Sequence, residues 1–229
     1  DDIVRTVEFK TGTMSDVTQR VFEYSSVRAY VQVDDSFADD NSFVLYGGIK
    51  PKLRVQYFSS APNTFFSMAL MTTANALKSR WDIEIDEVRG TGVSPALEGY
   101  DFYIFENRAP QTMPKDGVVF LVNPQALPNE LGVVLGDVMK GDSFVLAPGE
   151  PHALTNYMNL SNLLITQYTS ISKYNEAFTP IMYCAGVPVF LSRNDDGGKV
   201  AVMTFGLNFS DIAINWDFPT LIYNMFEYY

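Results

Sequence analysis

The stretch of residues 52–88 decides the fold, because its pattern changes from strand to helix and back to strand. It opens with Lys-Leu-Arg-Val-Gln-Tyr-Phe (residues 52–58), which predicts a strand. Thr-Phe-Phe-Ser-Met-Ala-Leu-Met-Thr-Thr-Ala-Asn-Ala-Leu-Lys (residues 64–78) follows, with apolar residues spaced on one helical face and Asn63 or Thr64 as the N-cap. Ile-Glu-Ile-Asp-Glu-Val (residues 83–88) predicts a second strand. A strand–helix–strand order favours parallel pairing of the two strands.

Downstream segments extend this pattern. Continuous apolar strands are expected over residues 100–105 and 117–122, which is typical of a parallel sheet covered on both faces. A hairpin around Gly186, a turn at residues 195–198 and a strand over residues 199–207 follow. The chain closes with an aromatic helix over residues 218–229. The region 49–229 therefore reads as an α/β domain.

Residues 1–48 have a different pattern, with strands expected over residues 3–10, 19–24, 27–33 and 42–46. The alternation of apolar and polar residues is typical of a half-buried antiparallel sheet. Three or four strands are too few for a self-sufficient domain. We expect a small antiparallel β-sheet, part of a β-sandwich, over residues 1–48 and a boundary at Gly47-Gly48.

Composition excludes several classes of function. The 229 residues contain 16 Lys and Arg against 27 Asp and Glu, and the net charge of −11 argues against a nucleic-acid partner. One Cys and one His allow neither an internal disulfide nor a metal site built from several such residues. No apolar run reaches the roughly 20 residues that span a bilayer. No motif indicates a cofactor, and the single Gly-Thr-Gly run at residues 90–92 lacks the third glycine of a phosphate-binding loop.

Polar residues follow the predicted strands of the α/β region, and these are the candidate ligand-pocket residues: Ser59, Ser60, Glu106, Asn107 and Asn123. Ligands of open α/β sheets bind at the carboxyl ends of the strands. Glu106 is a single carboxylate and does not form the pair that glycoside hydrolysis requires. For Glu106 the alternative is a hydrogen bond at a helix entry or a loop.

The acidic loop over residues 34–41 contains the weak calcium candidates Asp34, Asp39 and Asp40. Carboxylate oxygens are the ligands that Ca²⁺ prefers, yet the loop lacks the spacing of an EF-hand. A solvated turn is the alternative interpretation, so no metal site is assigned.

Three segments resemble the membrane-anchored BatA-like bacterial proteins, which are aerotolerance regulators associated with von Willebrand A domains. Asp-Asp-Asn-Ser-Phe (residues 39–43) resembles the step that ends their β-sandwich insert. Tyr-Asp-Phe-Tyr-Ile-Phe-Glu-Asn (residues 100–107), followed by residues 117–124, resembles their next conserved pattern. Residues 199–207, with Ser210-Asp211 and Phe218-Pro219, resemble their C-terminal pattern. The resemblance covers residues 28–229.

This resemblance implies a flavodoxin-like domain similar to class I glutamine amidotransferases over residues 49–229. It implies protein partners at the cell envelope and an extracytoplasmic location, with the intact protein anchored to the membrane. It also implies a place for a catalytic Cys directly after the strand that ends near Val122, where the chain has Asn123-Pro124-Gln125 instead. The lone Cys184 lies in an apolar run and the lone His152 in a proline-flanked loop. They could form a catalytic dyad only if the fold happened to bring these two segments together.

The sequence therefore predicts a non-catalytic, envelope-associated interaction or assembly module without catalytic residues. Two alternatives stay open at this point. One is a glutamine amidotransferase-like enzyme, and the other is a small-ligand sensor that uses the strand-end pocket.

Overall fold

The computed structural model describes residues 26–30, 42–46, 50–90 and 92–229. The chain divides into one unit over residues 1–49 and a second over residues 50–229. In the first unit, β1 (Ser26–Tyr30) pairs antiparallel with β2 (Ser42–Tyr46). The strands expected over residues 3–10 and 19–24 and the calcium candidates Asp34, Asp39 and Asp40 lie outside the described residues.

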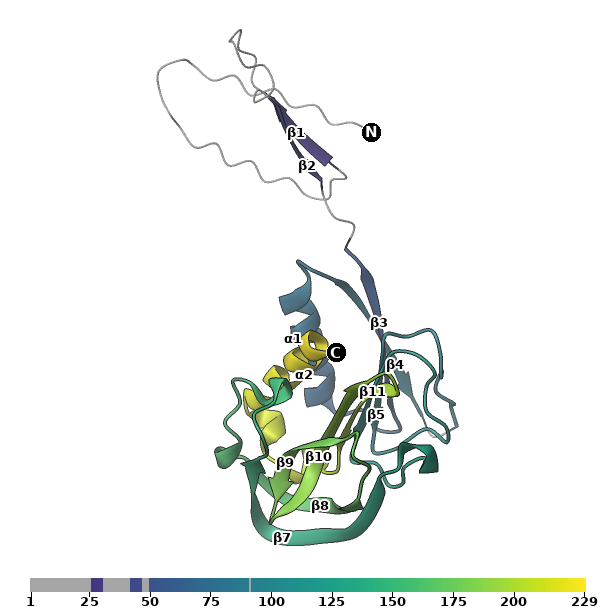
Figure 1. Ribbon diagram of the computed structural model, residues 1–229, viewed down its shortest axis with the longest axis vertical. Helices are drawn as coiled ribbons and strands as arrows, with labels where there is room; N and C mark the ends of the chain where they lie inside the picture. Colours follow the sequence, from purple (N-terminus) through teal and green to yellow (C-terminus); the bar gives the residue numbers. More distant parts are fainter. Residues whose placement is uncertain (1–25, 31–41, 47–49, 91) are drawn as a thin grey trace. The chain divides into compact units, whose positions relative to one another are not determined.

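The second unit is built on one nine-stranded mixed sheet (Figure 1). Its strand order is β4-β3-β5-β6-β11-β10-β9-β7-β8. Five neighbouring strands are parallel, from β4 to β11, and the remaining neighbours pair antiparallel. The bounds are β3 (Lys52–Ser59), β4 (Asp82–Arg89), β5 (Phe102–Glu106), β6 (Val118–Val122), β7 (Val134–Pro148), β8 (Leu164–Lys173), β9 (Thr179–Cys184), β10 (Val187–Asp195) and β11 (Gly198–Met203).

Two α-helices, α1 (Thr64–Leu77) and α2 (Asp217–Tyr228), pack on the same face of this sheet (Figure 1). The helix expected over residues 64–78 is confirmed, with Asn63 as its N-cap, because the Asn63 side chain accepts a hydrogen bond from the Phe65 N–H. The C-terminal aromatic helix is confirmed as well. It buries Phe218, Leu221, Ile222, Met225 and Phe226.

The expected flavodoxin-like α/β domain preceded by a small antiparallel sheet is wrong. A flavodoxin-like domain has helices on both faces of a parallel sheet, but the structure has a large, mostly-sheet fold with two α-helices among the described residues of the second unit. The connections from β5 to β6 and from β6 to β7 contain no α-helix; the second includes one short 3-10 helix, Asn129–Leu131. Their prolines, at positions 110, 114, 124 and 128, remove backbone N–H donors and disfavour helix.

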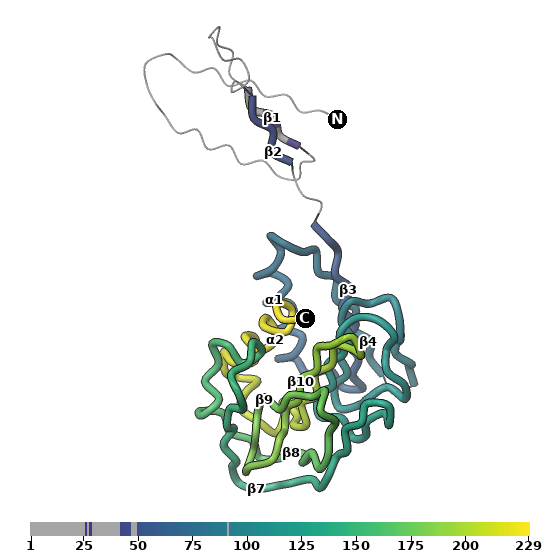
Figure 2. The backbone as a smooth tube through the Cα atoms, in the orientation of Figure 1, coloured from purple at the N-terminus to yellow at the C-terminus, as the bar shows by residue number. Residues whose placement is uncertain are grey.

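Loops and the ribbon of β7 and β8 therefore cover the second face of the sheet. The apolar core on this face includes Tyr103, Phe105 and Leu121, with Leu131 and Ile171 from the covering segments. The path of the chain around the sheet can be followed in Figure 2. Four of the nine strands in the sheet, β10, β9, β7 and β8, lie beyond the parallel part and extend it with antiparallel pairing. This extension makes the fold mostly sheet.

Candidate functional site

The parallel strands bring the predicted pocket residues to one edge of the sheet. Strand register places Ser59 opposite Glu106, and Glu106 opposite Val122. Asn107 and Asn123 each follow directly after a strand at this edge. These residues were predicted to lie together because each follows a parallel strand. The structure has them at the ends of neighbouring strands.

Glu106 is buried and joins two strands to the start of α1. The Tyr57 hydroxyl donates to Glu106 Oε2 over 2.6 Å, and the Asn63 N–H donates to the same oxygen over 3.2 Å. The Asn63 N–H also approaches the Tyr57 hydroxyl oxygen, at 3.0 Å. Burial, together with the negative charge of the Glu106 carboxylate, raises the pKa of the Tyr57 phenol. The geometry matches the helix-entry hydrogen bond that was the alternative for Glu106.

Asn107 and Asn123 both adopt left-handed backbone conformations, with φ of 59° and 48°. Asn tolerates this region better than most residues with a side chain. The Asn123 N–H donates to the Met203 carbonyl over 2.7 Å, and its side-chain amide donates to Asn107 Oδ1 over 2.7 Å. A Cβ added at Gly206 would lie 3.0 Å from Asn123 Nδ2. The turn after β6 is therefore closed by its own packing and hydrogen bonds.

The two serines contribute little open surface. Ser59 is buried, and its hydroxyl oxygen accepts a hydrogen bond from the Ala61 N–H over 3.3 Å. Ser60 is half-buried at the end of β3. Of the five predicted residues, Ser59, Glu106 and Asn123 thus serve the local packing of the strand ends.

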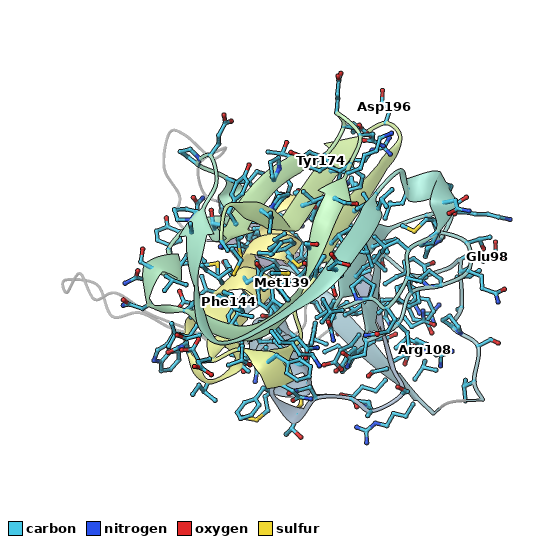
Figure 3. The ribbon with its side chains drawn as sticks, turned by 90° about the horizontal axis from the view of Figure 1, so that it is seen from below. Glu98, Arg108, Met139, Phe144, Tyr174 and Asp196 are labelled. Atoms are coloured by element: carbon cyan, nitrogen blue, oxygen red, sulfur yellow. The ribbon has the colours of Figure 1, made fainter. Side chains whose placement is uncertain are left out.

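A hollow of about 330 Å³ lies on the loops that follow β5 and β6, and Asn107 is the predicted residue that lines it. Arg108 also lines it and places its guanidinium carbon 5.3 Å from the centre of the Phe58 ring. Figure 3 shows Arg108 apart from the arc of β7 that carries Met139 and Phe144. The remaining lining residues are Ala109, Pro110, Gln111, Gln125, Ala126, Leu127 and Pro128. Sequence reasoning missed these loop residues, because it followed the strand ends and not the proline-rich loops beyond them.

The lone Cys and the lone His are engaged in separate contacts. Cys184 is buried in β9; burial raises the pKa of its thiol, and a hydrogen bond with Tyr168 partly offsets that rise. His152 caps a short 3-10 helix (Ala153–Thr155), with Nδ1 accepting from the Leu154 N–H over 3.1 Å. Burial lowers the pKa of His152. In these contacts neither side chain serves the other as a partner.

Among the residues that the structure describes, no three His, Cys, Asp or Glu side chains gather closely enough to hold a metal ion. Within the same ranges, no helix has both the length and the apolar character needed to span a bilayer.

No protein-family model matches the chain, and no curated protein matches it in sequence. Solved structures do resemble it. A cytoplasmic protein of Salmonella typhimurium matches with a TM-score of 0.56 at 11% identity, over 89% of this chain and 96% of that one. A second cytoplasmic protein, of Salmonella typhimurium LT2, matches with a TM-score of 0.53 at 10% identity, over 88% and 94% of the two chains. At such identities the likeness concerns the fold alone.

A ThuA-like protein of Parabacteroides merdae is also similar, with a TM-score of 0.45 at 8% identity, over 78% of this chain and 90% of that chain. ThuA-like proteins have a glutamine amidotransferase-like fold. None of these comparisons bears on the BatA-like or von Willebrand A part.

Proposed function

We propose that this chain is a non-catalytic interaction module with a glutamine amidotransferase-like fold. The observation that carries the proposal is the turn after β6, where an amidotransferase would hold its nucleophile. Asn123 occupies this position in a left-handed conformation, and its amide and backbone are engaged by Asn107 and Met203. An amide cannot act as the nucleophile of acyl transfer in the way a thiolate does.

The thiol of Cys184 does not supply the missing nucleophile. A catalytic Cys needs a lowered pKa and access to the substrate, whereas burial raises the pKa of the Cys184 thiol. A general base must reach the proton that it abstracts, and His152 Nδ1 is already the acceptor for the Leu154 N–H.

Covalent labelling tests the proposal. The native chain is incubated with a diazoketone analogue of glutamine and with iodoacetamide, and adducts are measured by intact mass. The expected result is slow labelling of the folded protein by either reagent and complete alkylation of Cys184 in denaturant. A stoichiometric adduct of the glutamine analogue on native Cys184, lost in the His152→Ala variant, would overturn the proposal in favour of an amidotransferase-like enzyme.

The proposed partners and the proposed location of the protein are taken from the resemblance to BatA-like proteins. Protein partners at the cell envelope and a membrane tether in the intact protein are part of this proposal. Fractionation of cells that make the intact protein tests the tether: it should remain in the membrane pellet after a high-salt wash. Release of the intact protein into the soluble fraction by that wash would contradict it.

The hollow at the strand ends favours a second candidate, a small-ligand sensor. Arg108 supplies a positive charge, and Gln111 and Gln125 supply amides, so the chemistry fits a small carboxylate or phosphate. Calorimetry with a panel of both anion classes tests it. Binding that is lost in Arg108→Ala and kept in Arg89→Ala, an arginine outside the hollow, would support the sensor; absence of binding across the panel would remove it.

A further inference from the structure

The outer face of α1 contains no charged side chain. Its sequence, Thr-Phe-Phe-Ser-Met-Ala-Leu-Met-Thr-Thr-Ala-Asn-Ala-Leu, has neither acidic nor basic residues. The inner face packs on the sheet, but Phe65, Met68 and Met71 stay 45%, 57% and 66% exposed. A surface helix ordinarily directs charged and polar residues to solvent. This face therefore has the composition of a surface that is normally buried.

Helix α2 extends this surface, since the two helices lie side by side (Figure 1). The rings of Phe66 and Phe218 are 5.0 Å apart near the N-terminal ends, and Arg80 pairs with Glu227 near the C-terminal ends. The helices therefore run in the same direction. We call the following exposed apolar side chains, from α1, from α2 and from the residues that lead into α2, the outer face: Phe65, Met68, Met71, Ile214, Trp216 and Tyr223.

The outer face has the area that a stable dimer needs. Ile214 is 73% exposed and Trp216 is 89% exposed. If a large side chain presents roughly 200 Å² when free, the six residues expose on the order of 700 Å² in one copy. A standard interface buries about 800 Å² per partner. Single exposed apolar residues are ordinary on a protein surface, whereas a patch of this size marks an interaction site.

Charge favours a second copy as the occupant. A chain with a net charge of −11 repels itself, so self-association needs a face from which charge is absent. Asp217 begins α2 at the N-terminal end of the layer, and Lys78 follows α1 at the other end. A two-fold axis that passes through the outer face perpendicular to the helices would set Lys78 of one copy toward Asp217 of the other. It would also make the helix dipoles of the two copies antiparallel, which is favourable.

We propose that the chain forms a two-fold homodimer through the outer face of α1 and α2. The inference deepens the proposed function, on which it rests for the idea of a binding module, by naming a partner. Met68 and Met71 lie near the centre of α1 and become buried in the dimer. Phe, Met, Trp and Tyr are the residue types enriched at such interfaces, while Lys, Glu and Asp are depleted.

Sedimentation equilibrium of the full chain over a concentration series tests the dimer. The parent should show a monomer–dimer equilibrium. Met71→Glu should raise the dissociation constant by about 30-fold or more, because it places an unpaired charge at the centre of the interface. Val138→Glu is the matched control, since Val138 is a similarly exposed apolar residue on β7, outside the outer face, and should leave the dimer unchanged. Met71→Ser removes apolar area without adding charge and keeps the test decisive if Met71→Glu fails to fold.

Each outcome decides the inference. A parent that stays monomeric at all concentrations overturns it, and a dimer that is equally stable in Met71→Glu and Met71→Ser overturns the assignment to this face. Cosedimentation of monomers with phosphatidylcholine vesicles, abolished by Met71→Glu, would identify a lipid surface as the occupant and overturn the dimer. Labelling of Cys184 decides the proposed function separately, so the two can fail independently.

Discussion

The buried hydrogen bond between Tyr57 and Glu106 gives the sharpest test of how the strand ends are held. Tyr57→Phe removes the hydroxyl and keeps the ring that stacks on Phe66 at 4.8 Å. The variant also removes the hydroxyl oxygen that the Asn63 N–H approaches, but this N–H keeps Glu106 Oε2 as an acceptor, so the main loss is the bond to Glu106. A hydrogen bond to a charged group contributes about 1.5–3 kcal/mol. The free energy of unfolding should therefore fall by about 2 kcal/mol.

Chemical denaturation followed by far-ultraviolet circular dichroism measures this loss. For a protein of this length the same change lowers the melting temperature by about 4–8 °C. Tyr157→Phe is the control, because Tyr157 is almost fully exposed and should change stability by less than about 0.5 kcal/mol. If Tyr57→Phe were as stable as this control, the Glu106 carboxylate would not depend on the tyrosine. The account of the site as a packed helix entry would then be refuted.

Three further variants test other parts of the second unit. Gly117→Ala should lower the free energy of unfolding by about 2–4 kcal/mol in denaturant, because φ is +66° and a Cβ would lie 2.5 Å from a backbone carbonyl oxygen. Gly186→Ala is the control: φ is +82° there, but the space around the added Cβ is open, so the loss should be about 1 kcal/mol. Equal losses in the two variants would show that the close contact at Gly117 does not matter. Burial and a hydrogen bond to Asp116 raise the pKa of Tyr103 to about 12, so the folded state holds this proton more tightly than the unfolded state. The free energy of unfolding should thus decrease as pH rises from about 10 to about 12 and decrease less steeply in Tyr103→Phe; identical slopes would rule this out. Asn123→Ala removes the side-chain hydrogen bond to Asn107 and a residue type that tolerates positive φ. The folded state should lose about 1–2 kcal/mol of stability, measured by thermal unfolding. An unchanged melting temperature would show that Asn123 does not hold the turn after β6.

Much of the local structure could be predicted because the local patterns are strong. The helix α1 and its cap at Asn63 are both present in the structure. The face that it buries carries Phe66 and Leu70, whereas the predicted face, on which Phe65 and Met68 lie, is exposed. The turn at residues 195–198 joins β10 to β11, with Asp195 opposite Gly198. The strand-end location of Glu106 and Asn123 also follows from pattern, since parallel strands end at the same edge.

The loops of the second face could not be assigned in the same way. Continuous apolar strands show that both faces of a sheet are covered, but they do not show by what. Prolines at positions 110, 114, 124 and 128 break helices, and here loops and the β7–β8 ribbon provide the cover. The hollow beside Arg108 depends on how two loops fold over the sheet, which no local period records.

By itself the sequence determined the helices, the order of the parallel strands along the chain and the absence of a thiol after β6. These are local properties, set by side-chain periodicity and residue identity. Only the tertiary structure decided that the antiparallel strands extend one sheet, that Glu106 serves a helix entry, and that α1 packs beside α2. Each of these depends on contacts between segments far apart in the chain, and such contacts are decided by the packing of the whole unit.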